Sequence, residues 1–159
     1  MGAVEQFIKQ KNFSCEYEKA HVGLLCVSSI LSHHSQFVLK EFDITLQQYN
    51  ALRILRGQYP NPVNLCVIKE RLIDRNSDTS RLIERLRKME LAERVTCEKD
   101  RRAIDILISK KGLNLLKKID QKVQSELFET VKILSEKEVE TLNVIIDKIV
   151  AKNEEFSNA

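Results

Sequence analysis

The chain has 159 residues, of which 43% are hydrophobic and 31% charged, and its formal net charge is +3. This balance allows a folded core beneath a charged surface and excludes a wholly disordered chain. With only four Gly, two Pro and no Trp, the chain lacks the turn residues that Gly-rich nucleotide-binding folds and β-sandwiches need. The composition therefore favours a mainly helical protein.

Several functional classes lack their signatures in this sequence. No apolar run approaches the roughly 18 residues of a membrane-spanning helix, and the first ten residues lack the apolar core of a secretory signal. The four cysteines form no C-x-x-C pair, which is typical of reduced thiols in the cytoplasm. The phosphate-loop, dinucleotide-binding, zinc-protease and nucleophile-elbow motifs are missing. We therefore expect a cytoplasmic protein without a membrane partner, a cofactor or catalytic residues.

The first two predicted helices lie in the N-terminal third of the chain. Residues 17–42 contain no Pro and a single Gly, and apolar residues recur along them at helical spacing. Thr45 and Gln48 form a capping box that opens a second helix, which we expect to end near Gly57. Both prolines then fall within residues 59–62, where they forbid a helix.

The middle of the chain carries two short helices followed by two strands. Apolar residues predict one helix over 67–73 and another over 79–89, joined by the polar turn 74–77. After Leu91 the apolar residues alternate, as they do in strands, on both sides of a highly charged tip at 98–102. Two helices with a tight turn, followed at once by such a hairpin, predict a winged helix-turn-helix.

The chain returns to a helical pattern beyond Gly112. Apolar residues recur every three or four positions between Leu116 and Leu134, and Ser135 and Glu138 form a second capping box that opens a last helix. These helices carry more apolar surface than a winged helix can cover. We therefore expect a second copy of the chain to bury it, together with the N-terminal helix.

The predicted fold class is mainly α (α+β). We divide the chain into an N-terminal helical part of a dimerisation region (1–42), a winged helix-turn-helix DNA-binding domain (43–112) and C-terminal helices that complete the dimerisation region (113–159). Positive charge concentrates in the middle: residues 64–112 hold 13 basic and 9 acidic side chains, a net charge of +4, whereas residues 1–63 sum to +1 and residues 113–159 to −2. This excess fits binding to double-stranded DNA.

The candidate DNA-reading residues are small polar and basic side chains on the second helix and at the hairpin tip. Small polar groups at a helix N-terminus meet base edges or phosphates, arginines offer paired donors to guanine, and arginines at a hairpin tip fit the narrow minor groove. On the helix the candidates are Ser77, Thr79, Ser80, Arg81, Arg85 and Lys88, and at the tip they are Lys99, Arg101 and Arg102. The candidates for phosphate contacts are Lys69, Lys88, Lys99 and Arg101. The alternative is a helical protein-interaction module whose winged helix does not read DNA, with the same charges forming a solvated face.

The segment DTSRLIERLRKMELAERVTCEKDRRAIDILISKKG, residues 78–112, resembles the signature of the MarR family of bacterial winged-helix regulators. The likeness extends upstream to residues 44–52 and downstream to residues 134–138. It implies a homodimer on a pseudo-palindromic operator, with the N- and C-terminal helices at the dimer interface. Such regulators are repressors more often than activators, and a ligand or an oxidant often changes the spacing of the two DNA-reading heads.

The resemblance also assigns roles by position. Ser80, Arg81 and Arg85 match the recognition-helix residues that face the major groove. Arg102 matches the wing arginine directed at the minor groove, and Asp100 matches the wing acid that orients this arginine.

The sequence departs from the family pattern in two respects. Glu90 stands where the family has Gly at the end of the recognition helix, which affects the tight turn that follows. Asp78 and Glu84 place two acids on the reading helix, where we expect them to neutralise part of its positive face.

The signal that such a regulator senses is left open. A small aromatic or amphipathic ligand could enter the cleft between the dimer helices and the reading head, with His33, Phe37 and Tyr49 as candidate lining residues. Cys26 in the N-terminal helix, with Cys15 nearby, would instead make a redox-sensing regulator. All three histidines lie upstream of the wing, unlike the ligands of the zinc-sensing branch, so we expect no metal site.

Overall fold

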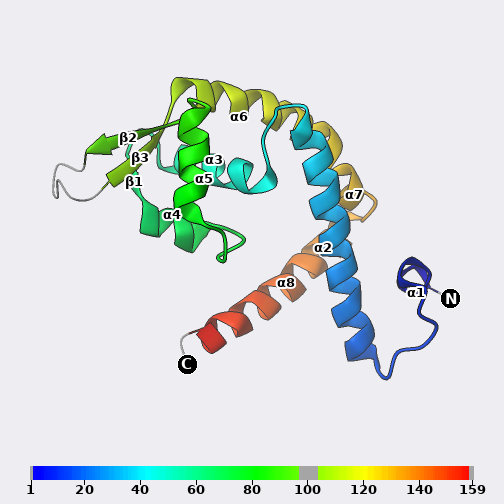
Figure 1. The fold of residues 1–159 in the computed structure, drawn as a ribbon. Helices are drawn as coiled ribbons and strands as arrows, with labels where there is room; N and C mark the ends of the chain where they lie inside the picture. The colour runs from blue at the N-terminus through cyan, green and yellow to red at the C-terminus, as the bar shows by residue number, and fades with distance from the viewer. Residues whose placement is uncertain (1, 97–103, 158–159) are drawn as a thin grey trace.

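The computed structural model describes residues 2–96 and 104–157 and is mostly helical, with three short strands (Figure 1). The N-terminal part holds α1 (Ala3–Ile8) and the long α2 (Glu16–Lys40). The winged helix holds α3 (Leu46–Gln58), β1 (Val63–Asn64), α4 (Leu65–Arg71), α5 (Thr79–Lys88), β2 (Ala92–Thr96) and β3 (Ile104–Ile108). The C-terminal part holds α6 (Lys110–Lys122), a π-helical turn (Val123–Leu127), α7 (Glu129–Lys132) and α8 (Glu136–Ser157).

The three strands form an antiparallel sheet in the order β1-β3-β2. Val63 pairs with Ile106, and Ala92 pairs with Ile108. Ile106 and Ile108 are buried while the residue between them is partly exposed, because successive side chains of a strand point to opposite faces. The alternation predicted for this strand is confirmed.

Two parts of the sheet differ in how they compare with the prediction from the sequence. β1 was not predicted, because two residues directly after the prolines are too few to show any alternation. The predicted hairpin has both of its strands, but its charged tip falls within residues 97–103, which lie outside the described residues.

Both predicted capping boxes are confirmed. The Thr45 hydroxyl accepts the backbone N–H of Gln48 at 3.2 Å, and the Gln48 side chain accepts the backbone N–H of Thr45 at 2.8 Å. The Ser135 hydroxyl accepts the backbone N–H of Glu138 at 3.4 Å, and the Glu138 carboxylate accepts the backbone N–H of Ser135 at 2.9 Å. Each box satisfies donors that the first turn of a helix otherwise leaves unpaired.

The predicted C-terminal end of α4, the first helix of the helix-turn-helix, is wrong. The apolar spacing predicted a helix through Ile73, whereas α4 ends at Arg71 and Leu72 is extended. The backbone N–H of Ile73 donates at 2.9 Å to the side-chain oxygen of Asn50, which lies on α3, so a tertiary contact turns the chain here. Leu72 is buried, but the side chain of Ile73 is 85% exposed.

The predicted start of the C-terminal helices is also displaced. α6 begins at Lys110, before Gly112, because the Ser109 hydroxyl accepts the backbone N–H of Gly112 at 3.0 Å and caps the helix. Gly112 lies against the chain that enters β2: a Cβ atom at this position would stand 2.3 Å from the backbone oxygen of Leu91. The absence of a side chain therefore permits this close approach.

One hydrophobic core joins the winged helix to α2 and α6. It is built from apolar residues of α3, α4, α5, the sheet, the end of α2 and the inner face of α6. Its largest fully buried members are Leu39, Leu52, Leu55, Ile68, Ile83, Leu86, Ile106, Ile108, Leu116 and Ile119. The core fixes α5 between α3, α4 and β2 and thereby defines which face of α5 points outward.

The flanking helices α2 and α8 are largely unburied in a single chain. α8 runs away from the rest of the fold in Figure 1, and none of its residues 136–152 is buried. The Nδ1 atom of His34 lies 3.2 Å from the hydroxyl oxygen of Thr130 and links α2 to α7. In the described chain, α2 is the one helix that is long and apolar enough to cross a membrane by those two criteria. A search for uninterrupted apolar runs misses α2, because serines and histidines are spaced along it.

Candidate nucleic-acid interface

The helix α5 has a fixed outward face. Its N-terminus is capped by Asp78, whose carboxylate accepts the backbone N–H of Arg81 at 3.0 Å. Leu82, Ile83 and Leu86 are buried on the inner face. The outward face carries exposed side chains that the sequence had predicted for DNA reading, namely Ser80, Arg81, Arg85 and Lys88.

The turn before α5 is organised by one carboxylate. Asp74 accepts the backbone N–H of Asn76 at 3.1 Å and the hydroxyl of Ser77 at 3.0 Å. Ser77 stays partly exposed at this turn. Thr79, in contrast, is only 7% exposed, and its hydroxyl donates to the backbone oxygen of Ser77 at 3.4 Å. Among the described reading residues predicted from the sequence, Thr79 is therefore the one that faces the core.

Neither Asp78 nor Glu84 forms an ion pair with the predicted reading residues of α5, although Lys88 lies near enough to Glu84 for the two charges to interact. The carboxylate of Asp78 is engaged at the helix cap. The carboxylate of Glu84 accepts Nη1 of Arg87 at 2.7 Å and 3.1 Å and also accepts Nη2 of Arg94, which lies on β2. The bond from Arg87 is the main cause that lowers the pKa of Glu84, so this carboxylate stays charged.

This pairing leaves a distinct set of basic side chains. Within the described residues, Arg81, Arg85 and Lys88 are exposed and form no ion pair. They lie at positions i, i+4 and i+7 of α5, so they share one side of the helix. We call these three side chains the basic edge of α5.

Arg81 and Arg85 of the basic edge border an open hollow of about 360 Å³ between α5 and the start of α3. The lining residues are Thr45, Gln47, Asp74, Ser77, Asp78, Arg81, Leu82 and Arg85. Gln47 was not predicted for this site, because only the pairing of Thr45 with Gln48 marked the start of α3 in the sequence. Its exposed amide can both donate and accept hydrogen bonds.

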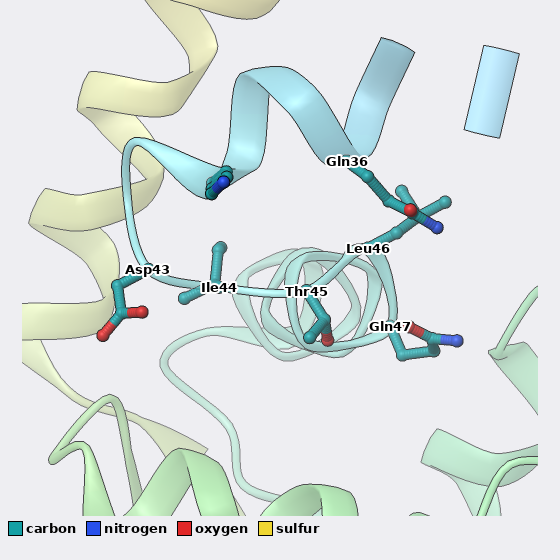
Figure 2. A pocket seen from close by; sticks show the side chains of 7 residues that line it. Gln36, Asp43, Ile44, Thr45, Leu46 and Gln47 are labelled. Carbon is teal, nitrogen blue, oxygen red and sulfur yellow. The ribbon is translucent and has the colours of Figure 1, made fainter. Parts of the chain in front are cut away.

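A second open hollow, of about 450 Å³, lies on the other side of the α3 N-terminus, where α2 turns into α3. Its lining residues are Gln36, Lys40, Asp43, Ile44, Thr45, Leu46 and Gln47, and Figure 2 shows them from close by. Thr45 and Gln47 line both hollows, so the two meet at the first turn of α3.

The three residues predicted to line a ligand cleft do not line either of these two hollows. His33 and Phe37 are exposed on α2. Tyr49 belongs to the core, is 6% exposed, and has the guanidinium carbon of Arg53 5.7 Å from the centre of its ring. The hollow in Figure 2 is instead lined by Gln36, the residue before Phe37, and by other residues of the α2–α3 turn.

The other predicted DNA contacts are divided between described and undescribed residues. Lys69 is exposed on α4, and Lys88 is exposed at the end of α5. The wing residues Lys99, Asp100, Arg101 and Arg102 lie outside the described residues.

The turn after α5 has the geometry that the family pattern assigns to Gly. Glu90 has a φ of 61°, in the left-handed region, which costs a residue with a side chain about 1 kcal/mol or more. Its backbone oxygen accepts the hydroxyl of Ser109 at 2.7 Å, which ties this turn to the start of α6. Its carboxylate lies 2.8 Å from Nζ of Lys111, and this bond lowers the pKa of Glu90.

The predicted sensing cysteines differ in their surroundings. Cys15 is exposed directly before α2, and the backbone N–H of Glu18, followed by the Ser14 hydroxyl, lowers the pKa of its thiol. Cys26 is partly buried within α2. Among the described residues, no group of three or more His, Cys, Asp or Glu side chains could hold a metal ion.

Comparisons with known proteins identify the fold. No protein-family model and no curated protein matches the sequence. A MarR mutant from E. coli in complex with operator DNA superposes with a TM-score of 0.76 at 22% identity, covering 87% of this chain and 99% of that one. S. aureus MepR in complex with DNA gives 0.75 at 21% identity, covering 89% and 99%. Wild-type E. coli MarR in its apo form gives 0.66 at 23% identity, covering 79% and 93%.

The superpositions extend beyond the winged helix, because 87% and 89% of the chain cannot be covered without the flanking helices. They confirm the predicted fold class and the resemblance drawn from the sequence at the level of the fold. The chain therefore has the winged-helix fold with flanking helices of the MarR-type transcription regulators.

Proposed function

We propose that the chain is a sequence-specific DNA-binding transcription regulator that reads its operator with α5. The observation that carries this proposal is the basic edge of α5, namely Arg81, Arg85 and Lys88. In the described chain, three basic side chains on the second helix of a helix-turn-helix are exposed and form no ion pair, while Asp78 caps the helix and Glu84 binds Arg87 and Arg94. In a protein-interaction module with a merely solvated face, Asp78 and Glu84 would serve equally well as partners of this edge.

The geometry of α5 fits a role in the major groove. Recognition helices present their N-terminal residues to base edges, which here are Ser80 and Arg81. Arginine offers two parallel donors to guanine, so Arg81 and Arg85 are our candidates for base reading. Lys69 and Lys88 carry single charges and are our candidates for phosphate contacts, which add affinity without sequence information. The wing arginines Arg101 and Arg102 stay candidates for the minor groove.

The comparisons support DNA binding, because two of the superposed structures contain DNA and one of them is an operator complex.

We further propose that the regulator is a homodimer. The helices α2 and α8 expose large apolar side chains that a single chain leaves uncovered, namely Leu24, Leu25, Val27, Ile30, Val144, Ile145, Ile146, Ile149 and Val150. Burial of such a side chain contributes about 1.5–3 kcal/mol, and a second copy offers the same two helices as a complementary surface. A two-fold axis would present two α5 helices to two half-sites of a pseudo-palindromic operator.

The regulator is expected to act as a repressor that a small ligand releases. The hollow in Figure 2 lies at the turn that joins α2 to α3, hence between the proposed dimer helices and the winged helix. A ligand held there by Gln36, Lys40 and Asp43 would bias the angle between the two parts. Such a bias changes the spacing of the two α5 helices and thereby the affinity for the operator.

Selection of binding sites from a random duplex library tests the proposal, followed by fluorescence anisotropy on the selected site and on random DNA. We expect a preference for one palindrome-like sequence, and an affinity that falls with salt at a log–log slope of roughly −0.9 per phosphate neutralised. Replacement of the exposed Lys137 on α8 by Ala is the control and should change neither affinity nor slope. Equal affinity for selected and random DNA at moderate salt would refute sequence-specific reading.

A further inference from the structure

Glu84 occupies a special place on α5. It lies one turn after Ser80 and one turn before Lys88, so its backbone position is within the outward face. Its side chain is 39% exposed, yet its carboxylate turns to the side of the helix away from Arg81, where Arg87 and Arg94 bind it. A free carboxylate at this position would repel DNA phosphates.

The two arginines that bind Glu84 lie on different elements. Arg87 lies on α5 itself and makes a two-pronged contact with the carboxylate, at 2.7 Å and 3.1 Å. Arg94 lies on β2, where it pairs with Ile106 of β3, the central strand of the sheet. In the described chain, the pair of Glu84 with Arg94 is the one ion pair that joins α5 to a strand.

The position of this link along α5 determines what it can do. The core holds the inner face of α5 through Leu82, Ile83 and Leu86, and the link adds a directional contact outside this core. The link acts at the outward side, in the same turns as Arg81 and Arg85. It therefore opposes rotation of the basic edge relative to the hairpin.

We propose that Glu84 is a positioning residue for DNA reading, which acts through Arg94 by fixing the rotation of α5 against β2. This inference rests on the proposed function, because it concerns the same interface. The carboxylate also keeps Arg87 and Arg94 from binding phosphates of any sequence. Loss of Glu84 thus weakens the preference for the selected site in two ways: the basic edge is less well oriented, and two released arginines add sequence-independent affinity.

The test measures the ratio of the Kd for random DNA to the Kd for the selected site. The variants are Glu84→Gln, Arg94→Gln and the double variant, with Glu93→Gln as the control. Glu93 is exposed on β2 and, within the described residues, forms no ion pair, so its replacement removes the same charge near the same place. All variants should stay folded by circular dichroism, because an exposed ion pair adds little to stability.

We expect the ratio to fall about threefold or more in Glu84→Gln and to stay unchanged in Glu93→Gln. The double variant is decisive, because its net charge equals that of the parent chain. If Glu84 acts by fixing the rotation of α5, the double variant should have a low ratio, as the two single variants do. If Glu84 acts only through its charge, the ratio of the double variant should return to the parent value, and the inference is overturned. A ratio in Glu84→Gln equal to that of Glu93→Gln also overturns it. A parent chain that shows no preference overturns the proposed function itself, and with it this inference.

Discussion

Replacement of Gly112 by Ala should strongly destabilise the protein, although Gly112 lies within a helix. A Cβ atom at this position would stand 2.3 Å from the backbone oxygen of Leu91 and 2.9 Å from Cγ1 of Ile108. The oxygen of Leu91 cannot move aside easily, because it accepts the backbone N–H of Ser109 at 3.1 Å. Overpacking of this kind costs about 1–3 kcal/mol and more where backbone must shift, against a gain of about 1 kcal/mol in helix propensity.

Gly57 provides the matched control. It also lies in a helix, near the end of α3, and a Cβ atom there would meet nothing within 4 Å. Gly57→Ala should therefore raise the free energy of unfolding by about 0.5–1 kcal/mol, whereas Gly112→Ala should lower it by about 2 kcal/mol. Chemical denaturation at fixed protein concentration measures both. If Gly112→Ala is as stable as the parent chain, the close approach of α6 to the start of β2 is wrong.

Three further predictions concern the turn after α5, the N-terminal thiol and the proposed dimer. The free energy of unfolding should be about 0.5–1 kcal/mol higher for Glu90→Gly than for Glu90→Ala, because both variants lose the ion pair with Lys111 but only Gly relieves the left-handed φ. Equal free energies of unfolding would contradict the backbone strain at this position. The thiol of Cys15 should react with iodoacetamide at a lower pH than a cysteine in an unstructured peptide, because its lowered pKa yields thiolate at a lower pH. The same pH dependence in both would contradict the effect of the Glu18 N–H on this thiol. Ile149→Asp should give folded monomers in sedimentation, since Ile149 is exposed in the single chain; an unchanged dimer would place the interface elsewhere.

Local chemistry explains what the sequence could predict. The capping boxes at Thr45 and Ser135 involve residues three positions apart, so their motif is visible before any fold is known. The alternation in β3 and the apolar spacing in α5 likewise follow from the period of one element.

Contacts between distant parts of the chain explain what the sequence could not predict. The end of α4 depends on Asn50 of α3, and the partners of Glu84 depend on how β2 approaches α5. The sequence therefore could not show that Asp78 would cap α5 and that Glu84 would bind Arg87 and Arg94 rather than the basic edge. Gln47 reaches the same hollow as Arg81 only because α3 and α5 pack side by side.

The assignment of α5 as the recognition helix is tested most directly by comparing Arg81→Ala with Lys88→Ala across the selected site and its single-base variants. Arg81→Ala should cost about 1–3 kcal/mol on the selected site and relax the preference at one base pair. Lys88→Ala should weaken binding to all sequences about equally and reduce the salt slope by about 1. Equal and uniform losses in both variants would contradict the account, because α5 would then bind phosphates without reading bases.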